Sequence, residues 1–394
     1  MITNLDNTQK KFIYTKSLPP FSNLVCDFLG DFSENLKRNK KANKFSDLMA
    51  AAFWCRKNNI ISKKKFYLDS FNRVGLGVVF HVPPSNIEIN FLYTFIFGLL
   101  SGNSNIIRLS KKKGKRTHLI LNILNKTFKK KKYLFLKNNN SFIEYDKNDE
   151  ISGKISLISD ARMIWGGDQT INYFKKFETH PRCRDIMFSD RYSLAILNSD
   201  KINLANDSEM YKLSQNFFND TYLNDQMSCS SPHLILWLGK KIDKAKDKFW
   251  NNLEKYVKKK YSLLDNTAIQ KYTHFLNFCA LYKDDIKEFK THKNYIHRVE
   301  LKKMIKNIDK FKSFGGFFIE SNINKISDIK NIVNKNFQTL SYYGFEKKIL
   351  KNKIKFNEFK GIDRVVPIGQ TLDIDLAWDG FDIIKQLTRV VEVK

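Results

Sequence analysis

The sequence predicts an α/β fold built on a doubly wound, mostly parallel sheet, followed by a second α/β lobe. Short apolar, β-branched runs alternate with amphipathic helical runs from about residue 77 to residue 190. This order implies parallel strands with helices on both faces of a sheet. The alternation starts again at "YSLAILN". The chain has 394 residues, 42% of them hydrophobic, which is enough for two or three packed lobes.

The first half begins with helices and continues as strand and helix in turn. The apolar stripe of "FSDLMAAAFWCRKN" predicts a helix within the first 62 residues. Alternation in "KKKFYLDSFNRVGLGVVFHVPP" predicts a hairpin over residues 63–76 and then a buried strand, Gly77–Val82. An apolar helix is expected to start near Ile87 and to stop at "SGN", because glycine favours a helix end. "SNIIRLS" predicts the next strand, and "GKRTHLILNILNKTF" the next helix.

Two more short strands are expected at about Phe142–Tyr145 and Lys154–Ile158, before the glycine turn and helix of "WGGDQTINYFKKF". The second half gives the strand "YSLAILN", the helix "EMYKLSQNFFNDTYL" and the strand "HLILWLG". A helical section is expected from about Lys244 to Asp285. Ligands of such sheets bind at the carboxyl ends of the strands, so the loops that follow strands are candidate sites.

The net charge of +29 comes from 69 Lys and Arg against 40 Asp and Glu. This balance favours acidic partners such as nucleic acid, an anionic membrane surface or a phosphorylated cofactor. The alternative is a solvated surface, since the lysines accompany abundant Asn, Ile and Phe. Basic and aromatic residues interleave in "KKKKYLF" and "YVKKKYSLL", which leaves nucleic-acid binding as an interpretation from another class. The basic runs are dispersed and carry no nucleic-acid motif, so no nucleic-acid partner is expected.

The cysteines and the apolar runs bear on the compartment. Five scattered cysteines form no Cys-x-x-Cys pair, which argues against a zinc site or a disulfide framework and favours a reducing compartment. The longest apolar run, near Phe91–Leu100, is too short to span a bilayer. "MITNLDNTQKKF" lacks the apolar core of a signal peptide. We therefore expect a cytoplasmic protein with no metal site and no transmembrane segment.

Two turns that follow strands have features of a cofactor site. In "GVVFHVPPSN" a buried strand ends at two prolines, and Ser85 and Asn86 are good helix N-caps. The helix N-terminus behind them would present free N–H groups to an anion. In "WGGDQTI", Gly166 and Gly167 would let a diphosphate approach the backbone closely. Neither turn is a Gly-x-Gly-x-x-Gly fingerprint, and a plain helix start explains the glycine pair equally well.

Cys229 lies in "NDQMSCSSP", among small and polar residues just before an apolar run. A nucleophilic thiol needs a helix end or a cation to gain thiolate character. A lone cysteine beside an apolar strand is also an ordinary core residue, and both interpretations stay open on these residues alone. His233 would project along the strand and is not expected to be a partner of Cys229. His81, inside an apolar strand, is expected to be a hydrogen-bonded core residue.

Taken together, these motifs resemble those of the aldehyde dehydrogenase superfamily. "GVVFHVPPSN…SGNSNIIRLS" is similar to its strand ending in Pro-x-Asn and the Gly-Asn strand that follows, "CSSP" to its cysteine turn, and "LTRVVEVK" to its C-terminal oligomerisation strand. The closer resemblance is to the LuxC acyl-CoA reductase family, through "WGGDQTI", "DQMSCSSP", "SYYGF" and "DRVVPIGQTLDIDLAWDG" in the same order. These motifs lie between about residue 70 and the C-terminus.

The resemblance implies an aldehyde dehydrogenase-like fold with a Rossmann-like cofactor domain, an α/β catalytic domain and a small β oligomerisation element. The expected segments are 1–62, a helical part of the cofactor domain; 63–76, an oligomerisation hairpin; 77–190, the nicotinamide-cofactor-binding domain; 191–375, the catalytic domain with Cys229; and 376–394, a tail with the oligomerisation strand. A homo-oligomer, either a dimer or a tetramer, is implied.

The resemblance also implies roles for single residues. Cys229 falls on the family nucleophile, and Asn86 on the asparagine whose side-chain amide helps to form an oxyanion hole. Arg108 falls where the superfamily has a lysine at the adenosine ribose, and a cation there also suits a 2′-phosphate. The glycine turn falls beside the cofactor diphosphate. The implied cofactor-binding residues are Ser85, Arg108, Trp165, Gly166 and Gly167.

Two departures from the superfamily pattern are visible. Met187, in "IMFSDRYS", stands near the place of the glutamate that activates water in hydrolytic aldehyde dehydrogenases. The absence of this glutamate fits an enzyme that exchanges acyl groups with thiols. In "FKSFGGFF", Lys312 would replace a glutamate at the nicotinamide ribose, which puts in doubt how that ribose is held.

The implied reaction is reduction of an activated fatty acyl group to the aldehyde. The acyl group arrives on coenzyme A or on an acyl carrier, and an acyl-protein synthetase can be a partner. Lys111–Lys113 follow Arg108, and such a positive cluster favours NADPH over NADH because it can hold an extra phosphate. An ordinary aldehyde-oxidising dehydrogenase of the same fold is the alternative.

Overall fold

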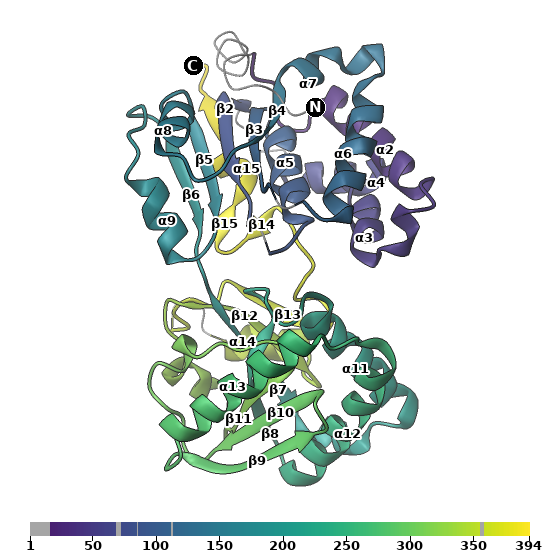
Figure 1. Ribbon diagram of the computed structural model, residues 1–394, viewed down its shortest axis with the longest axis vertical. Coiled ribbons are helices and arrows are strands. Elements are labelled where there is room, and N and C mark those ends of the chain that lie inside the picture. The colour runs from purple at the N-terminus through teal and green to yellow at the C-terminus, as the bar shows by residue number, and fades with distance from the viewer. Residues whose placement is uncertain (1–15, 68–71, 85, 112, 355–357) are drawn as a thin grey trace. The chain divides into compact units, whose positions relative to one another are not determined.

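Two α/β units make up the chain, and each has its own sheet and its own apolar core. The first unit comprises Met1–Ser189 and Phe381–Lys394, and the second comprises Asp190–Gly380. The computed structural model describes residues 16–394 except 68–71, 85, 112 and 355–357. Figure 1 shows both units and labels most of their helices and strands.

The first unit is built on a five-stranded parallel sheet with the order β4-β3-β2-β5-β6. β2 lies at the centre, and the chain winds outward to β3 and β4 on one side and to β5 and β6 on the other. This topology confirms the predicted doubly wound sheet. It also makes the carboxyl ends of β2 and β5 a switch point, where such sheets bind ligands. The strands are β2 (Val78–Val82), β3 (Ser104–Leu109), β4 (Asn140–Glu144), β5 (Ala161–Trp165) and β6 (Arg184–Phe188).

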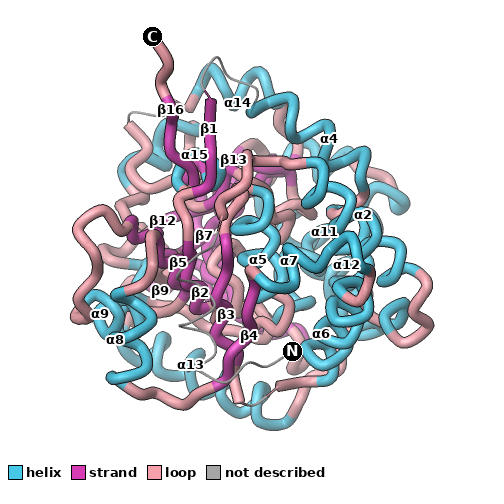
Figure 2. Tube along the Cα trace, turned by 90° about the horizontal axis from the view of Figure 1, so that it is seen from above, coloured by secondary structure: helices cyan, strands magenta, loops and turns pink. Residues whose placement is uncertain are grey.

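Helices cover both faces of this sheet (Figures 1 and 2). On one face, α8 and α9 pack apolar side chains such as Ile155 and Phe174 against β2, β3 and β4. On the other face, Phe95 of α5 lies 5.1 Å from the ring of Phe142 in β4 and 6.4 Å from that of Phe128 in α6. The helices are α2 (Asn23–Lys37), α3 (Ser46–Trp54), α4 (Lys57–Lys64), α5 (Asn90–Leu100), α6 (Lys115–Phe128), α7 (Leu134–Asn138), α8 (Asp149–Leu157), α9 (Asp168–Lys175) and α15 (Ile383–Gln386).

The apolar run Phe91–Leu100 forms most of α5, which is buried almost all round. A helix that is apolar on every side belongs to the interior of a protein or of a membrane. No helix in the described part of the chain has both the length and the apolar character needed to cross a bilayer.

His81 lies in β2 and is fully buried. Its Nδ1 is 2.7 Å from the Thr94 hydroxyl, and its Nε2 is 2.8 Å from Oδ1 of Asn105. Burial lowers the pKa of the imidazole to about 4, so the ring is neutral at physiological pH. The prediction of a hydrogen-bonded core histidine is confirmed.

Residues 154–158, expected to be a strand, belong instead to the end of α8. Ile151, Ile155 and Ile158 recur at helical spacing, so they form one apolar stripe rather than alternate faces of a strand. The Asn148 side chain caps this helix by accepting a hydrogen bond from the Ile151 N–H. The strand at this place in the fold is β5, which the sequence patterns did not predict.

The expected hairpin over residues 63–76 also differs from the structure. Residues 63–67 complete α4 and a 3-10 turn, and residues 68–71 lie outside the described residues. β1 (Asn72–Gly75) pairs antiparallel with β16 (Thr388–Val391), the predicted C-terminal strand. The partner of β1 thus comes from the far end of the chain, which a local alternation pattern cannot reveal.

The second unit is built on a seven-stranded sheet with the order β13-β12-β7-β8-β11-β10-β9. All its pairings are parallel except that of β9 with β10. The predicted strands "YSLAILN" and "HLILWLG" are the central pair β7 and β8, which confirms both. The strands of this unit are β7 (Tyr192–Asn198), β8 (Pro232–Leu238), β9 (Ile286–His292), β10 (Ile296–Leu301), β11 (Phe317–Asn322), β12 (Phe337–Tyr343), β13 (Arg364–Pro367) and β14 (Ala377–Trp378). The short strand β15 (Phe381–Asp382) belongs to the first unit.

Two apolar clusters cover the two faces of the second sheet. Phe217 of α11 and Trp250 of α12 belong to the cluster on one face. Phe275 and Phe278 of α13 belong to the cluster on the other face. Full burial of such a side chain stabilises the fold by roughly 1.5–3 kcal/mol. The helices are α10 (Ser199–Leu204), α11 (Asp207–Thr221), α12 (Ile242–Lys260), α13 (Asp265–Leu281) and α14 (Lys347–Lys353).

Candidate active site

Cys229 lies in a tight turn that leads directly into β8. Asp225 and Gln226 open this turn with left-handed backbone conformations, φ 51° and 61°. Aspartate and similar short polar residues adopt this region more readily than β-branched residues do. The turn reverses the chain after α11 and places Cys229 at the amino-terminal edge of the sheet.

The buried Gln226 side chain fixes the turn against the start of β11. Its carbonyl oxygen accepts hydrogen bonds from the N–H groups of Gly316 and Phe317, at 3.1 and 3.2 Å. Its amide nitrogen donates to the carbonyl oxygens of Pro232 and Phe317, both at 3.0 Å. One side chain therefore makes four hydrogen bonds, and the backbone around Cys229 is held in a defined place.

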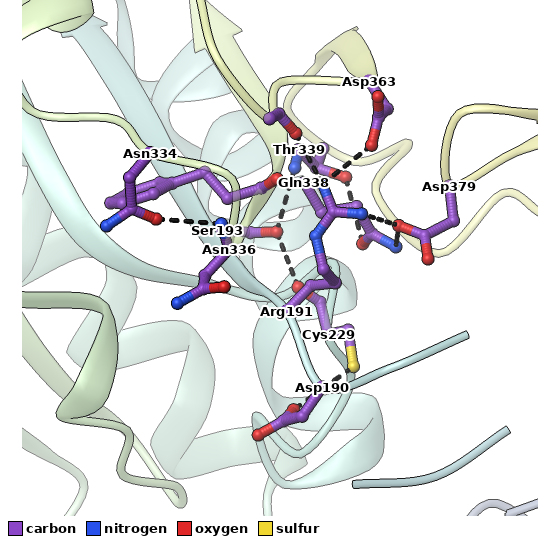
Figure 3. A network of polar contacts seen from close by, with 12 residues as sticks. Asp190, Arg191, Ser193, Cys229, Asn334, Asn336, Gln338, Thr339, Asp363 and Asp379 are labelled. Carbon is purple, nitrogen blue, oxygen red and sulfur yellow. Dashed lines mark hydrogen bonds and ion pairs between the residues drawn. The ribbon is translucent and has the colours of Figure 1, made fainter. Parts of the chain in front are cut away.

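Three segments bring polar side chains to the same edge of this sheet. Asp190 comes just before β7, Cys229 just before β8 and Lys312 shortly before β11. The three strands are parallel neighbours, so their amino ends lie side by side. Sγ of Cys229 lies 3.5 Å from Oδ1 of Asp190, as Figure 3 shows. The Lys312 ammonium donates to the same oxygen at 2.5 Å and also to the carbonyl oxygen of Arg191.

Burial and neighbouring charges act in opposite directions on the Cys229 thiol. Loss of solvent around this side chain is the largest influence and raises the pKa of the thiol above its ordinary value. The Lys312 ammonium and the Arg191 N–H lower the pKa, and the Asp190 carboxylate raises it. Cys229 is therefore a partly buried thiol whose pKa burial raises, with a cation beside it that acts against this rise.

The cysteine backbone is tied to two neighbouring strands through Ser193. The Ser193 hydroxyl donates to the carbonyl oxygen of Cys229 at 2.6 Å and accepts a hydrogen bond from the Thr339 N–H at 3.1 Å. Figure 3 shows this chain of contacts running from β12 through β7 to the cysteine turn.

Arg191 connects the segment before β7 to the motif "DRVVPIGQTLDIDLAWDG". Its guanidinium donates to the carboxylates of Asp379 and Asp363, at 2.9 and 2.8 Å, and the Gln338 amide donates to Asp379 at 2.8 Å (Figure 3). Arg191 also donates to the carbonyl oxygen of Gly361 at 2.7 Å. The motif thus anchors Arg191, the residue next to Asp190. Among the described residues, the Asp190 carboxylate is the one that lies within hydrogen-bonding distance of the Cys229 thiol.

His233 is buried four residues after Cys229. Burial is the main cause that lowers the pKa of its imidazole to about 3, with a further contribution from Lys312, so the ring is neutral. It packs beside the Tyr192 ring, with the ring centroids 5.3 Å apart. Its buried Nδ1 has no hydrogen-bond partner among the described residues.

In the first unit, the candidate cofactor residues gather along the carboxyl edge of the sheet. Asn86 follows β2, Arg108 lies near the end of β3, and Trp165 ends β5. β2 is the neighbour of both β3 and β5, so these three places belong to adjacent strands. Ser85 lies outside the described residues.

The "WGG" turn has features that fit a bound diphosphate. A Cβ added at Gly167, the N-cap residue of α9, would meet no atom within 4 Å. At Gly166 a Cβ would lie 2.8 Å from Cβ of Thr170, so only glycine fits there. Trp165 stacks on Phe188 at 3.7 Å, and its buried indole N–H has no partner among the described residues. An open helix N-terminus beside an unused donor suits an anionic group.

Arg108 and the lysines after it differ from the expected positive cluster. The Arg108 guanidinium lies over the Tyr145 ring, 4.7 Å from its centroid. Lys111 pairs with Asp146 at 2.5 Å, and Lys113 pairs with Glu144. Lys112 lies outside the described residues. The expectation of a dense positive cluster is therefore wrong for Lys111 and Lys113, because the end of β4 supplies carboxylates that balance them.

The loop after β2 differs from the sequence expectation as well. The helix α5 begins at Asn90 and its N-cap residue is Ile89, so Asn86 does not cap it. The intervening residues form bends and turns, and Asn86 is exposed. Its amide is thus not used to cap a helix.

The sequence patterns did not identify Asp190 as a residue of the site. Met187, near the expected place of a glutamate, is part of β6 in the first unit. Asp190, three residues on, is the carboxylate that contacts the thiol. The available signal was the polar segment "SDRYS" just before a predicted strand, which is the same position relative to a strand that "SCSSP" occupies.

Solved structures with this fold are aldehyde dehydrogenases and related enzymes. Proline utilization A from Bradyrhizobium japonicum superimposes with a TM-score of 0.67 at 10% identity, over 99% of this chain and 45% of the other. Thermus thermophilus 1-pyrroline-5-carboxylate dehydrogenase gives 0.66 at 8% identity, over 98% and 83%. Staphylococcus aureus betaine aldehyde dehydrogenase gives 0.63 at 13% identity, over 93% and 82%. The chain thus spans less than half of the proline utilization A protein.

The two mostly parallel sheets and these neighbours show that the chain has the aldehyde dehydrogenase fold. The profile of the acyl-CoA reductase (LuxC) family matches residues 36–390. The chain therefore belongs to the acyl-CoA reductase (LuxC) family. No curated protein sequence matches the chain.

Proposed function

We propose that this member of the LuxC family is an acyl-CoA reductase that uses a nicotinamide cofactor and forms its aldehyde through a covalent thioester at Cys229. The supporting observation is the place of the thiol, beside the Lys312 and Asp190 ion pair at the edge of the second sheet. The thiolate attacks the acyl carbonyl, and coenzyme A leaves as a thiolate. After reduction, collapse of the hemithioacetal releases the aldehyde and restores the Cys229 thiolate.

The Asn86 amide and a backbone N–H near Cys229 are proposed to stabilise the oxyanion of both tetrahedral species. Donors of this kind act on charge that appears only in the transition state. The exposed position of Asn86 and its place in the motif resemblance support this role. Oδ1 of Asp190 already accepts hydrogen bonds from the Lys312 ammonium and the Cys229 thiol, so this oxygen is not free to activate water. Hydrolysis of the acyl-enzyme is therefore expected to be slow.

The cofactor is proposed to lie along the carboxyl edge of the first sheet. Gly166, Gly167 and the Trp165 indole would hold the diphosphate, and Arg108 would hold the adenosine ribose. Ser85, outside the described residues, stays a proposed cofactor-binding residue on the motif resemblance alone. A reduced nicotinamide supplies, when bound, the two electrons and the hydrogen that convert the thioester carbonyl to the aldehyde level. The protein supplies position and charge.

The acyl donor is proposed to be a fatty acyl-CoA or an acyl-carrier thioester, with an acyl-protein synthetase as a further source. A series of acyl-CoA chain lengths, each measured with NADPH and with NADH, tests the function directly. Loss of nicotinamide absorbance together with trapped aldehyde is the expected result. If no chain length gives either a loss of absorbance or a trapped aldehyde, the proposed function is contradicted.

NADPH is proposed as the preferred cofactor, and Arg108 as the residue that holds its 2′-phosphate. We expect Arg108→Ala to raise the KM for NADPH about tenfold, the value of a charge-assisted hydrogen bond, and to change the KM for NADH much less. Lys111→Ala is the matched control, because Asp146 already balances that lysine. Equal efficiency of the wild type with both cofactors would remove the case for a phosphate site.

The protein is proposed to be a cytoplasmic dimer or higher even oligomer that assembles through β16. Val390 and Val391 in this strand are 43% and 38% exposed, and β1 and β16 form a sheet of their own among the described strands. An exposed apolar edge of this kind favours pairing with another chain.

Deletion of Arg389–Lys394 is expected to give a monomeric or insoluble protein, because it removes most of β16. This deletion keeps Leu387, which is buried, and Thr388, whose carbonyl oxygen accepts a hydrogen bond from Arg184 at 2.9 Å. Val393→Ser, beyond the end of β16, is the control. Sedimentation velocity at micromolar concentration distinguishes the outcomes, and a monomeric full-length enzyme would refute assembly through this strand.

A further inference from the structure

One oxygen of Asp190 connects a cation to the candidate nucleophile. Oδ1 of this carboxylate lies 2.5 Å from the Lys312 ammonium and 3.5 Å from Sγ of Cys229. Both contacts occur at the same atom, so the ammonium is a near neighbour of the sulfur (the positions of Asp190 and Cys229 are drawn in Figure 3). The Lys312 side chain is only 26% exposed, so solvent screens its charge incompletely.

The chain holds the Lys312 segment firmly against the cysteine turn. The Gly315 N–H donates to the carbonyl oxygen of Asp225 at 3.0 Å. The buried Lys271 ammonium donates to the carbonyl oxygen of Gly315 at 2.9 Å. Together with the hydrogen bonds of Gln226 to the start of β11, these contacts join the two loops. The position of Lys312 is therefore a built feature of this unit.

We propose that Lys312 sets the ionisation of Cys229. Its ammonium stabilises the thiolate that attacks the acyl group, and Asp190 is a positioning residue that keeps the ammonium beside the sulfur. The proposal rests on the nucleophilic role of Cys229 proposed above. Lys312 stays protonated through the cycle, because the departing coenzyme A thiolate takes its proton from solvent and collapse of the hemithioacetal restores the Cys229 thiolate.

The charges that face the thiol give the sign of each effect. Burial and the carboxylates of Asp190 and Asp379 raise the pKa of the thiol, whereas Lys312 and the Arg191 N–H lower it. The neighbouring His233 is neutral. Loss of the Lys312 charge must therefore raise the pKa of Cys229. Loss of the Asp190 charge must lower it, provided that Asp190 is not the base that takes the thiol proton.

The experiment measures alkylation of Cys229 by iodoacetamide from about pH 6 to about pH 10, a range that brackets an ordinary thiol pKa. Mass spectrometry of the Cys229 peptide reports the rate. Lys312→Met is expected to slow alkylation about tenfold at neutral pH and to move the whole profile to higher pH, since a shift of about one pKa unit is ordinary for a nearby charge. Lys312→Arg keeps the charge and is the matched control, with a profile close to wild type.

Asp190→Asn separates the roles of the pair. The asparagine oxygen still accepts from Lys312, so the profile is expected to move to lower pH. Slower neutral alkylation in Asp190→Asn would make Asp190 the base and overturn the proposal. A Lys312→Met profile that superimposes on wild type would also overturn it. If Lys312→Met loses its circular dichroism spectrum, Lys312→Gln is compared with Lys312→Arg, and equal profiles in that pair overturn it.

The alkylation assay contains no acyl-CoA, so its result is independent of the proposed function. If the wild type is never acylated at Cys229, the nucleophilic role is contradicted, and the alkylation profile is unaffected by that result. An unchanged Lys312→Met profile in an enzyme that does form the acyl-cysteine removes the role of Lys312 alone.

Discussion

Replacing Cys229 with alanine is expected to abolish both the acyl-enzyme and the aldehyde. The sulfur is the atom proposed to carry the acyl group, and no neighbouring side chain is placed to replace it, because Asp190 is held in an ion pair and the His233 imidazole is buried. The substitution removes one partly exposed atom, so the fold is expected to survive. Activity below detection with an unchanged circular dichroism spectrum is the predicted outcome.

Cys183→Ala is the matched control for this prediction. Cys183 is also partly buried, but it lies in the first unit. Burial raises the pKa of its thiol to about 11, so it is protonated at neutral pH. We expect this variant to be labelled by radioactive acyl-CoA as the wild type is. Labelling that persists undiminished in Cys229→Ala would refute the assignment of the nucleophile.

Asn86→Ala is expected to lower turnover roughly 100-fold, the usual cost of losing one oxyanion donor. The effect should appear in kcat, since the amide acts on charge that develops only in the tetrahedral species. Asn86 is exposed and does not cap α5, so its loss is expected to leave stability almost unchanged. Steady-state kinetics together with a thermal melt separate an effect on the reaction from an effect on the fold.

Asn58→Ala is the control for this variant. Asn58 is an exposed asparagine on α4 of the same unit, and we expect its replacement to leave kcat unchanged. Turnover of Asn86→Ala equal to that of the wild type would rule out the oxyanion role, and the backbone N–H near Cys229 would then be the remaining proposed donor.

Local patterns were sufficient for the fold class and for the strands at the centres of both sheets. β2, β3, β7 and β8 are short apolar runs between turn residues, and such runs depend on few distant contacts. The polar residues of the Cys229 turn stand out against the strand that follows, so the sequence alone is enough to make this turn a candidate site. The prediction of a strand at residues 154–158 was wrong because a short apolar run fits both the period of a strand and that of a helix. The N-cap at Asn148 favoured the helix.

The sequence by itself determined the alternation of strands and helices, the family motifs and the candidate nucleophile. Only the tertiary structure decided which charges meet. Asp190, Cys229 and Lys312 are far apart in the chain and become neighbours because β7, β8 and β11 are adjacent. The carboxylates at the end of β4 pair with the lysines that follow β3 for the same reason, and β1 finds β16 across almost the whole chain. Strand order depends on how the apolar faces of the entire unit pack, and no local pattern in the sequence records that order.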